Sequence, residues 1–210
     1  PNLVVIMTDD MGYEDVGFNG CKDIPTPNID SIAFNGANLV NGYVSFPVCS
    51  PSRAGFITGR YQDRFGYTTN PTIDPTNDSA GLPLNQMTMA EMLKTRGYKS
   101  AIIGKWHLGT HPKFHPINRG FDYFYGYNCQ RLAHKYYPNW LWRNHEKVSL
   151  GERDTPEGYS HYSLTNEGLD FIESNSKNPF FLYLSYAIPH SKIQKPKAVS
   201  YTHLTLPTKP

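Results

Sequence analysis

Short apolar runs of β-strand composition alternate with helical segments along this chain, and that order limits the possible folds more than any other feature. The strand candidates are Leu3 to Met7, Lys99 to Ile103 and Phe180 to Ile188. Such alternation is typical of the α/β class, in which helices flank a mostly parallel central sheet. We predict this fold class, with Leu3 to Met7 as a buried strand. A chain that opens inside a core strand is expected to have lost preceding residues, so the lack of a signal peptide says little.

Four helices are expected around these strands. They begin at Thr26-Pro27 and at Ser50-Pro51, and they span Met89 to Arg96 and about Tyr162 to Ser174. The apolar stripes expected to face the core are Ile29, Ile32 and Ala33 in the first helix, and Ala54 and Ile57 in the second. The third helix has the clearest limits, because Thr88 and Glu91 can form a capping box and Gly97 can adopt the left-handed stop.

Two stretches lack this periodicity. Residues 127–159 carry Trp140, Trp142 and several tyrosines among polar residues, and we predict a long excursion over the active edge of the sheet, in reach of substrate. Residues 200–210 continue no visible element and resemble an adapter-derived tail. We therefore expect residues 200–210 to be non-native sequence outside the fold.

The composition excludes several classes of protein. The 20 basic and 18 acidic residues are interspersed and leave a net charge of +2, so no basic face for nucleic acid is indicated. No apolar run reaches the length of a transmembrane segment. Cys21, Cys49 and Cys129 are an odd number of cysteines and cannot form a complete disulfide framework.

All three predicted strands end in polar residues. Asp9-Asp10 follow the first strand, Lys105 and His107 follow the second, and His190 follows the third. Open parallel sheets bind ligands beyond the carboxyl ends of their strands, so these side chains should meet at one edge. Two adjacent carboxylates can hold a hard cation such as Ca²⁺, although a solvated turn or a helix cap uses such a pair as well.

Cys49 lies directly before a predicted helix start, with Arg53 one turn further on. The positive end of a helix and a nearby guanidinium both stabilise negative charge at position 49. A reactive thiolate is therefore one interpretation. The other is that Cys49 is simply a small buried apolar residue, which is how most lone cysteines behave.

The run from Cys49 to Arg60 resembles the signature of the formylglycine-dependent (type I) sulfatases, which belong to the alkaline-phosphatase-like superfamily. It reads Cys-Ser-Pro-Ser-Arg and, after four residues, Thr-Gly-Arg. Further matches, in the expected order over about residues 1–197, are Thr8-Asp9-Asp10-Met11-Gly12, Thr26-Pro27-Asn28-Ile29-Asp30, Gly104-Lys105-Trp106-His107-Leu108-Gly109, Gly120-Phe121-Asp122-Tyr123-Phe124-Tyr125-Gly126 and Pro189-His190. The resemblance, to arylsulfatases and N-acetylgalactosamine-6-sulfatases among others, makes residues 1–199 an incomplete, N-terminal part of a sulfatase catalytic domain.

This resemblance implies a sulfuric ester hydrolase that acts on a sulfated carbohydrate or another sulfated small molecule. Cys49 would be oxidised to formylglycine (3-oxoalanine) by a formylglycine-generating or an anaerobic sulfatase-maturating enzyme. One hydroxyl of the hydrated aldehyde would attack sulfur, and loss of a proton from the other would then expel sulfate. Because family members are commonly exported, a periplasmic or secreted location is expected.

The resemblance also implies roles for individual residues. These are a Ca²⁺ site for Asp9, Asp10 and Cys49, orientation of the hydrate for Arg53, a sulfate contact for Lys105, acceptance of the hydrate proton for His107 and protonation of the leaving alcohol for His190. The family completes the calcium site with an Asp-Asn pair, and the sulfate clamp with another lysine, further along the chain. No Asp-Asn pair follows His190 here, so we expect the 210-residue chain to be inactive or nearly so.

Three other functions compete with this interpretation. A phosphate or phosphonate ester hydrolase of the same superfamily would use similar cations and metal ligands, although Cys49 within the full signature favours sulfate. A degenerate domain would bind sulfated ligands without turnover. A cysteine hydrolase would need a histidine base near Cys49 and would be blocked by thiol alkylation.

Overall fold

A computed structural model gives the fold and describes residues 1–190 and 193–196. Within these residues, one mixed sheet has the strand order β1-β6-β2-β3-β4-β5. Its parallel part consists of β1 (Leu3–Asp9), β6 (Phe180–Pro189), β2 (Lys99–Lys105) and β3 (Tyr123–Tyr127). The strands β4 (Trp140–Arg143) and β5 (Glu146–Ser149) add an antiparallel hairpin. The predicted α/β class with a mostly parallel sheet is confirmed.

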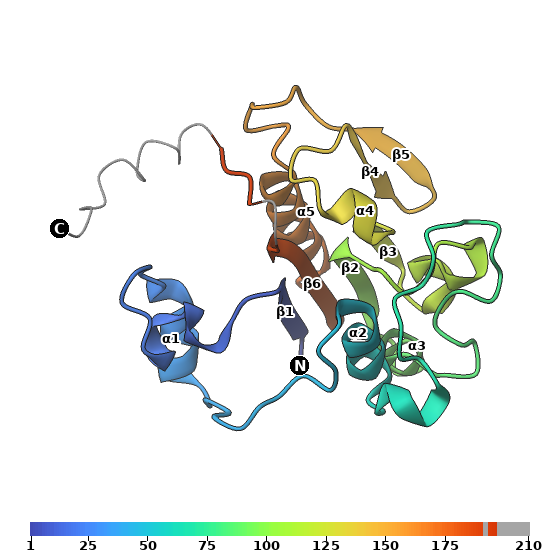
Figure 1. The fold of residues 1–210 in the computed structure, drawn as a ribbon, viewed down its shortest axis with the longest axis horizontal. Coiled ribbons are helices and arrows are strands. Elements are labelled where there is room, and N and C mark those ends of the chain that lie inside the picture. The colour runs from blue at the N-terminus through green and yellow to red at the C-terminus, as the bar shows by residue number, and fades with distance from the viewer. Residues whose placement is uncertain (191–192, 197–210) are drawn as a thin grey trace.

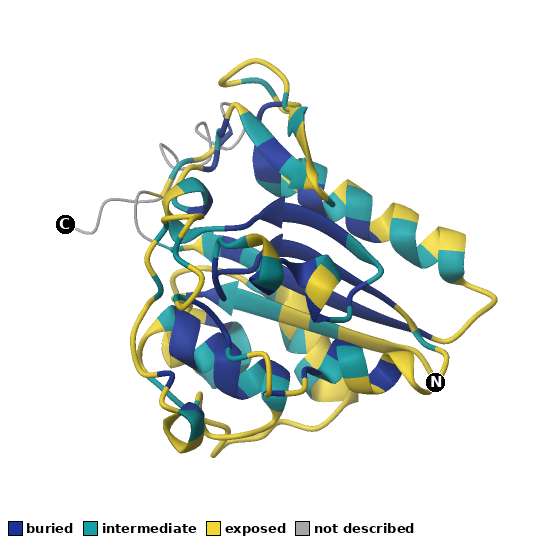
Figure 2. Ribbon diagram, turned by 90° about the vertical axis from the view of Figure 1, so that its right-hand side faces the viewer, coloured by how far each residue is buried: buried dark blue, intermediate teal, exposed yellow. Residues whose placement is uncertain are grey.

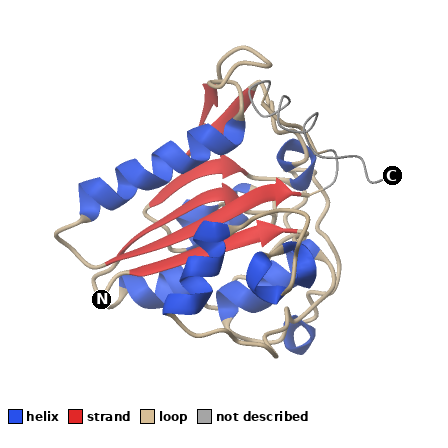
Figure 3. Cartoon of the chain, turned by 90° about the vertical axis from the view of Figure 1, so that its left-hand side faces the viewer, coloured by secondary structure: helices blue, strands red, loops and turns tan. Residues whose placement is uncertain are grey.

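Helices cover both faces of this sheet (Figure 3). The α-helices are α1 (Pro27–Asn35), α2 (Cys49–Thr58), α3 (Met89–Lys94), α4 (Gln130–Ala133) and α5 (Ser160–Asn175), and short 3-10 helices lie at Tyr13–Asp15, Gly17–Asn19, Gln62–Phe65, Pro112–Phe114 and Pro116–Arg119. On one face, Ile102 of β2 packs in the same cluster as residues of α2 and α3. On the other, Ala101 and Ile103 share a cluster with Leu164 of α5. The strand β2 is therefore buried on both sides.

Leu3 to Met7 form a strand as predicted, but the prediction that this strand is buried was wrong. The strand β1 exists and extends to Asp9, but it occupies one edge of the sheet. Its residues Leu3, Val4 and Ile6 are 37%, 47% and 55% exposed. An apolar run of this kind has the same composition in a central and in an edge strand, so the pattern alone could not separate the two.

The first helix begins where predicted, but its apolar stripe does not face the core. Ile29 and Ile32 are exposed in α1, and no residue of that helix is buried. Figure 1 shows α1 standing apart from the sheet, and Figure 2 shows that the buried residues are concentrated in the central strands of the sheet. In α2, by contrast, Ala54 and Ile57 are buried as predicted.

The other predicted limits agree with the structure to within two residues. The helix α2 begins at Cys49, two residues before the predicted first helical residue Pro51, and α3 ends at Lys94, two residues before the predicted end. The capping box is present, since the Thr88 hydroxyl accepts from the Glu91 N–H and a Glu91 carboxylate oxygen accepts from the Thr88 N–H. Gly97 has the expected left-handed backbone, with φ of +76°.

The expectation of an irregular excursion over residues 127–159 was wrong in part. This segment contains α4 and the β4–β5 hairpin, which widens the sheet beyond β3. Asn144 takes φ of +52° at the turn between the two strands. The strands have only four residues each, which is too short for an alternating pattern to stand out.

Two further predictions concern membrane-spanning segments and the last residues of the chain. None of the helices in the described part of the chain combines the length and apolar character needed to cross a bilayer. Residues 200–210, which we expected to be non-native, lie outside the described residues.

Candidate active site

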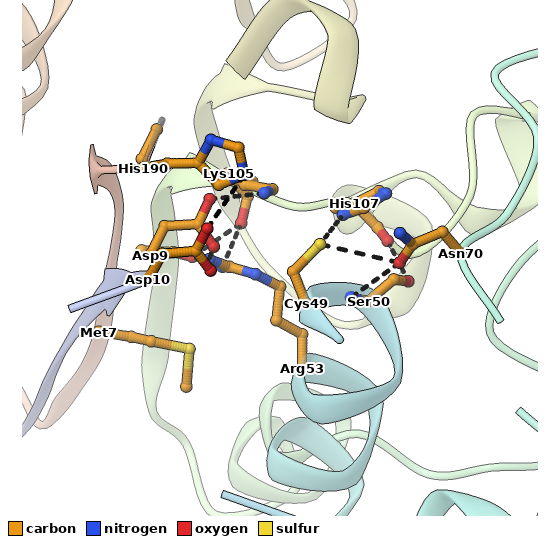
Figure 4. A network of polar contacts seen from close by, with 12 residues as sticks. Met7, Asp9, Asp10, Cys49, Ser50, Arg53, Asn70, Lys105, His107 and His190 are labelled. Atoms are coloured by element: carbon orange, nitrogen blue, oxygen red, sulfur yellow. Dashed lines mark hydrogen bonds and ion pairs between the residues drawn. The ribbon is translucent and has the colours of Figure 1, made fainter. Parts of the chain in front are cut away.

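The polar ends of the parallel strands meet at one edge of the sheet, where α2 also begins (Figure 4). Asp9 is the last residue of β1, Lys105 is the last residue of β2, and His190 directly follows β6. Cys49 is the first residue of α2. The sequence predicted that these strand ends would meet, and their side-chain contacts confirm that placement.

Asp9 is buried between two cations. Its Oδ1 accepts a hydrogen bond from Nη2 of Arg53 at 3.1 Å, and its Oδ2 accepts one from Nζ of Lys105 at 2.5 Å. The three side chains are at most 4% exposed. Burial alone would raise the pKa of Asp9, but the charges and hydrogen bonds of Arg53 and Lys105 outweigh burial and hold that pKa below its usual value. The carboxylate therefore stays ionised.

Arg53 fixes the start of α2 to the sheet. Its Nη1 donates to the carbonyl oxygen of Lys105 at 3.1 Å and also to the hydroxyl of Ser185 on β6. The Ser185 hydroxyl in turn donates to the same Lys105 carbonyl at 2.7 Å. Because a guanidinium is planar and rigid, contacts on both of its terminal nitrogens fix its orientation.

Gly104 allows β2 and β6 to approach closely just before this site. It has φ of +119°, and a Cβ atom there would lie 1.9 Å from the carbonyl oxygen of Ser185. Only glycine fits such an approach with such a backbone. The close approach of Gly104 to Ser185 places Lys105, the last residue of β2, beside β6.

Cys49 contacts His107 from the other side of the same edge. Its Sγ lies 3.3 Å from Nδ1 of His107 and 3.7 Å from Oδ1 of Asn70. The Asn70 amide oxygen also accepts from the backbone N–H of Ser50 at 3.2 Å. The side chain at position 49 is therefore held between an imidazole and an amide.

The His107 ring is directed at Cys49 by an unusual backbone. His107 has φ of +59°, which is uncommon for a residue other than glycine. Its N–H donates to the Asn128 carbonyl at 3.3 Å, and its carbonyl accepts from Oγ of Ser50 at 2.6 Å. Contacts on both sides of the residue hold this conformation in place.

The His107 imidazole is neutral. Burial, aided by the charges of Lys105 and Arg53, lowers the pKa of His107 to about 3. Its Nε2 is buried and has no hydrogen-bond partner among the described residues. Because a neutral imidazole carries a hydrogen on only one of its two nitrogens, the other nitrogen can accept a proton.

Asp10 and His190 form a more exposed pair beside this cluster. Nε2 of His190 lies 3.2 Å from Oδ2 of Asp10, and the Asp10 side chain is 59% exposed. The His190 ring stacks on the ring of His134, with centroids 4.1 Å apart, and its carbonyl accepts from the Tyr136 hydroxyl at 2.6 Å. The imidazole of His190 is thus oriented from both sides.

A cavity of about 440 Å³ between β1 and α2 reaches the site. Asp9, Asp10, Cys49 and Arg53 are among the residues that line it. Lys105 does not line it, because its side chain is fully buried behind Asp9. Cys49 is more accessible to a ligand here than Arg53, since the Arg53 side chain is only 3% exposed.

The described residues supply only part of a metal site. No group of three or more His, Cys, Asp or Glu side chains among them is placed to hold an ion. Asp9 and Asp10 are adjacent carboxylates at the cavity, a donor type that suits a hard cation, and carboxylate oxygens have further lone pairs beyond the contacts described. The two residues therefore fit one side of a Ca²⁺ site, which takes about six to eight oxygens.

Four residues of the site were not predicted from the sequence: Ser50, Asn70, His134 and Ser185. For Ser185 there was a signal, because it is the one hydroxyl within the apolar strand Phe180–Pro189 apart from tyrosines. Asn70 and His134 lie in segments without a strand or helix pattern around them, and only the fold brings them to Cys49 and His190.

Comparisons with known proteins agree with this geometry. The family model described as Sulfatase matches residues 1–206. N-acetylgalactosamine-6-sulfatase of Mus musculus is 38% identical over 211 residues, a match that covers 92% of this chain and 40% of the relative. The chain therefore spans about two fifths of the length of this curated relative.

Solved structures share the fold. The crystal structure of Ps i-CgsB superimposes with a TM-score of 0.83 at 34% identity, covering 96% of this chain and 48% of that one. The structure of BT4656 in complex with its substrate D-glucosamine-2-N,6-O-disulfate has a TM-score of 0.81 at 27% identity, covering 100% of this chain and 39% of that one. The likeness thus extends over nearly the whole chain.

Proposed function

Because this chain belongs to the sulfatase family, we propose that the longer protein containing it hydrolyses sulfate esters. The observation that carries the proposal is the position of Cys49. It starts α2 within a complete Cys-x-Pro-Ser-Arg motif, it lines a cavity, and its Sγ lies 3.3 Å from a neutral His107 ring. This arrangement supports the proposal because a side chain that can be modified lies next to a histidine that can accept a proton and next to a cluster of cationic side chains.

We propose that Cys49 is converted to formylglycine by a formylglycine-generating or anaerobic sulfatase-maturating enzyme. The aldehyde hydrate supplies the hydroxyl that attacks sulfur. The first residue of α2 suits this nucleophile, because the positive end of the helix stabilises negative charge that develops there. The amide of Asn70 and the ring of His107 limit the orientations that the side chain can take.

His107 and Arg53 act next to residue 49. The neutral His107 ring accepts the proton that the second hydroxyl of the hydrate loses when sulfate is expelled. Arg53 lies one helical turn from residue 49 and stays charged and rigid through Asp9 and Ser185. Its charge stabilises the negative oxygens at the cavity without reorganisation during the reaction.

Lys105 and His190 serve the sulfate and the leaving group. By resemblance to the family, Lys105 is proposed to contact a sulfate oxygen. Its Nζ is bonded to Asp9 and fully buried in this structure, so that contact requires its side chain to move past Asp9. His190 is the proposed general acid, since its ring is oriented by Asp10, which lines the cavity, and by His134. The leaving alcohol would depart on the side of Asp10, the exposed member of the Asp10–His190 pair.

Asp9 and Asp10, together with residue 49, are the proposed protein ligands of a Ca²⁺ ion in the described part of the chain. The ion would supply positive charge next to the reacting sulfate. We propose that further oxygen ligands come from other polypeptide, from water and from the bound sulfate, because two carboxylates fall well short of the usual six to eight oxygens.

The proposed substrate is a sulfated carbohydrate. The mouse relative is an N-acetylgalactosamine-6-sulfatase, and BT4656 was solved with a disulfated glucosamine as its substrate. Both names describe sulfated amino sugars, which favours a sugar over a small aryl sulfate. An exported protein, periplasmic or secreted, would meet such glycans outside the cell.

The test begins with the mass of the peptide that contains Cys49, isolated from the longer protein after expression beside a maturating enzyme. Conversion of thiol to aldehyde lowers that mass by about 18 Da and creates a group that reacts with hydrazides, unlike the ordinary nucleophiles of hydrolases. Activity on an aryl sulfate, an aryl phosphate and sulfated sugars is then measured side by side. Hydrolysis of sulfate esters alone is the expected result.

Each rival function predicts a different outcome. Preference for the phosphate ester would identify a phosphatase relative. An unmodified thiol, with binding of sulfated sugars but no turnover, would identify a degenerate domain. Loss of activity on treatment with iodoacetamide would indicate a cysteine hydrolase, because a formylglycine enzyme resists thiol alkylation.

The 210-residue chain by itself is proposed to be inactive or nearly so. It contains part of the proposed metal site and spans about two fifths of the mouse relative. Comparison of the purified 210-residue chain with the longer protein, at equal concentration and with Ca²⁺ present, tests this. Comparable turnover by both would refute it.

A further inference from the structure

A second cavity lies directly beside the candidate site. It has a volume of about 360 Å³ and is lined by residues of the segment between α4 and β4, together with Arg153 and Gln194. His134 belongs to its lining, and the same ring stacks on the ring of His190. The cavity is therefore next to a residue that contacts the proposed general acid.

The cavity contains two cationic side chains. Lys135 and Arg153 both line it, both are exposed, and neither forms an ion pair within residues 1–190 and 193–196. Glu152 and Asp154 flank Arg153 in sequence and are exposed, and neither forms an ion pair with it. Unpaired cations in a concave site attract anions more strongly than cations on an open surface.

Aromatic rings form another part of the same wall. Trp140 and Tyr137 line the cavity. Tyr137 is held by the Tyr159 ring, with centroids 5.2 Å apart, and Trp140 is held by Lys147 at 4.5 Å from its centroid. Such fixed rings offer flat apolar surface to the C–H face of a sugar ring, and little conformational entropy is lost on binding.

The backbone of this wall is tied to the strand that carries the active edge. The N–H of Tyr136 donates to Oε1 of Gln194 at 2.9 Å, and the Tyr136 hydroxyl donates to the His190 carbonyl at 2.6 Å. The cavity therefore has a fixed distance from His190. Its lining is mostly polar, with His134, Lys135, Asn139, Arg153 and Gln194 beside the two aromatic rings, and a concave site of this size and polarity suits a small polar ligand such as a saccharide unit.

We propose that this cavity binds the sugar next to the one that carries the scissile sulfate, and that Lys135 and Arg153 select a second anionic group on it. The proposal rests on the sulfatase function proposed above, because it identifies His190 as the group at the leaving alcohol. The ligand chemistry is an anionic saccharide unit. The anion is either a second sulfate or a uronic acid carboxylate, and the experiment separates these two sources.

The test uses the longer, formylglycine-containing protein and the double variant Lys135→Gln/Arg153→Gln. Its control is Arg96→Gln/Lys177→Gln, which removes the same charge from exposed residues near the amino ends of β2 and β6. The substrates are an aryl sulfate, a monosulfated disaccharide, a disulfated disaccharide and a monosulfated disaccharide with a uronic acid. Rates are compared at low and at high salt.

For the two disaccharides that carry a second anion, kcat/KM of the double variant should fall by tenfold or more, mainly because KM rises. This loss should be smaller at high salt, because salt screens the attraction between the cations and the anion. The aryl sulfate and the monosulfated disaccharide should change less than twofold, and the control pair should change none of the four. A larger loss with the disulfated than with the uronic acid substrate assigns the site to sulfate, and the reverse assigns it to carboxylate. Equal losses on all four substrates, or none on any, would overturn the proposal.

Binding separates this proposal from the proposed catalytic function. The longer protein with Cys49→Ala is titrated calorimetrically with the disulfated and the monosulfated disaccharide. Tighter binding of the disulfated sugar that Lys135→Gln/Arg153→Gln abolishes supports the subsite even if no sulfate ester is hydrolysed. Equal affinity for both sugars refutes the subsite and leaves the hydrolase proposal standing.

Discussion

Nζ of Lys105 lies 2.5 Å from Oδ2 of Asp9, and both side chains are almost completely removed from solvent. Arg53 approaches the other oxygen of the same carboxylate. Two buried cations therefore share one buried anion, which leaves one positive charge in excess at the edge of the sheet. Such an excess is costly in a folded protein unless an anion binds there, and it fits a site for a tetrahedral dianion or ester.

Replacement of Asp9, the anion shared by the two cations, should strongly destabilise the protein. In Asp9→Asn, Arg53 and Lys105 remain buried without a counter-charge, and the free energy of unfolding should fall by about 3 to 5 kcal/mol, the usual cost of breaking a buried pair from one side. Urea denaturation of the purified chain, followed by circular dichroism, measures this. Asp10→Asn is the matched control, because Asp10 is mostly exposed and its pair with His190 should contribute about 1 kcal/mol or less. Similar losses in the two variants would contradict the assigned burial.

Ser185 positions Arg53 and Lys105 without being placed to touch substrate. Its hydroxyl accepts from Arg53 and donates to the Lys105 carbonyl. In Ser185→Ala, we expect about 1 to 3 kcal/mol less stability, because buried partners lose a hydrogen bond. We also expect a lower kcat of the longer protein.

Ser163→Ala is the control for that variant. Ser163 lies within α5, and its hydroxyl bonds the hydroxyl of Tyr125 in β3 at 2.7 Å, away from the site. Its loss should reduce stability and leave kcat unchanged. If kcat falls equally in both variants, Ser185 has only a structural role.

Gly104 should tolerate no side chain. An added Cβ would meet the Ser185 carbonyl at 1.9 Å in a left-handed backbone, so Gly104→Ala must push β2 away from β6. We expect a loss of more than about 3 kcal/mol, or failure to fold. Gly59→Ala has a left-handed φ of +63° but open space around its Cβ, and it should cost only about 1 to 2 kcal/mol. Thermal melts of both variants test the difference, and equal shifts in Tm would exclude a steric cause at Gly104.

The strand ends could be placed from the sequence because their arrangement follows from local patterns and one general rule. Apolar runs give the strands, and parallel strands bring their carboxyl ends to one edge, so the meeting of Asp9, Lys105 and His190 was predictable. Contacts across that edge were not. Asn70 reaches Cys49, and His134 reaches His190, only through packing that connects segments far apart in sequence.

Burial was the least predictable property of the fold. The run Leu3 to Met7 is as apolar as the central strand Phe180–Pro189, yet only the latter has neighbours on both sides. The helix α1 has an apolar stripe, but among the described residues nothing buries it. Hydrophobic periodicity reports which face a residue occupies, whereas burial depends on what lies opposite that face.

His115 provides a titration that is independent of the candidate site. It is buried against the rings of Phe124 and His145, and its Nδ1 accepts from the backbone N–H of Ile117 at 3.3 Å. Burial, aided by His145, lowers the pKa of His115 to about 4, from an ordinary value of 6.5. Between these two pH values the unfolded chain binds a proton at this residue that the folded chain does not.

The stability of the folded chain should therefore fall as the pH drops from about 6.5 towards 4, because protons then favour the unfolded state. One such group contributes a slope of up to about 1.4 kcal/mol per pH unit in this window and none above it. In His115→Asn, the amide oxygen can still accept from the Ile117 N–H, but nothing titrates at that position. Urea unfolding at pH 7.0, 6.0 and 5.0 should give a shallower decline for His115→Asn than for the wild type, with the two differing least in slope above pH 7. A parallel decline in both proteins would show that His115 is protonated equally in the folded and unfolded chains.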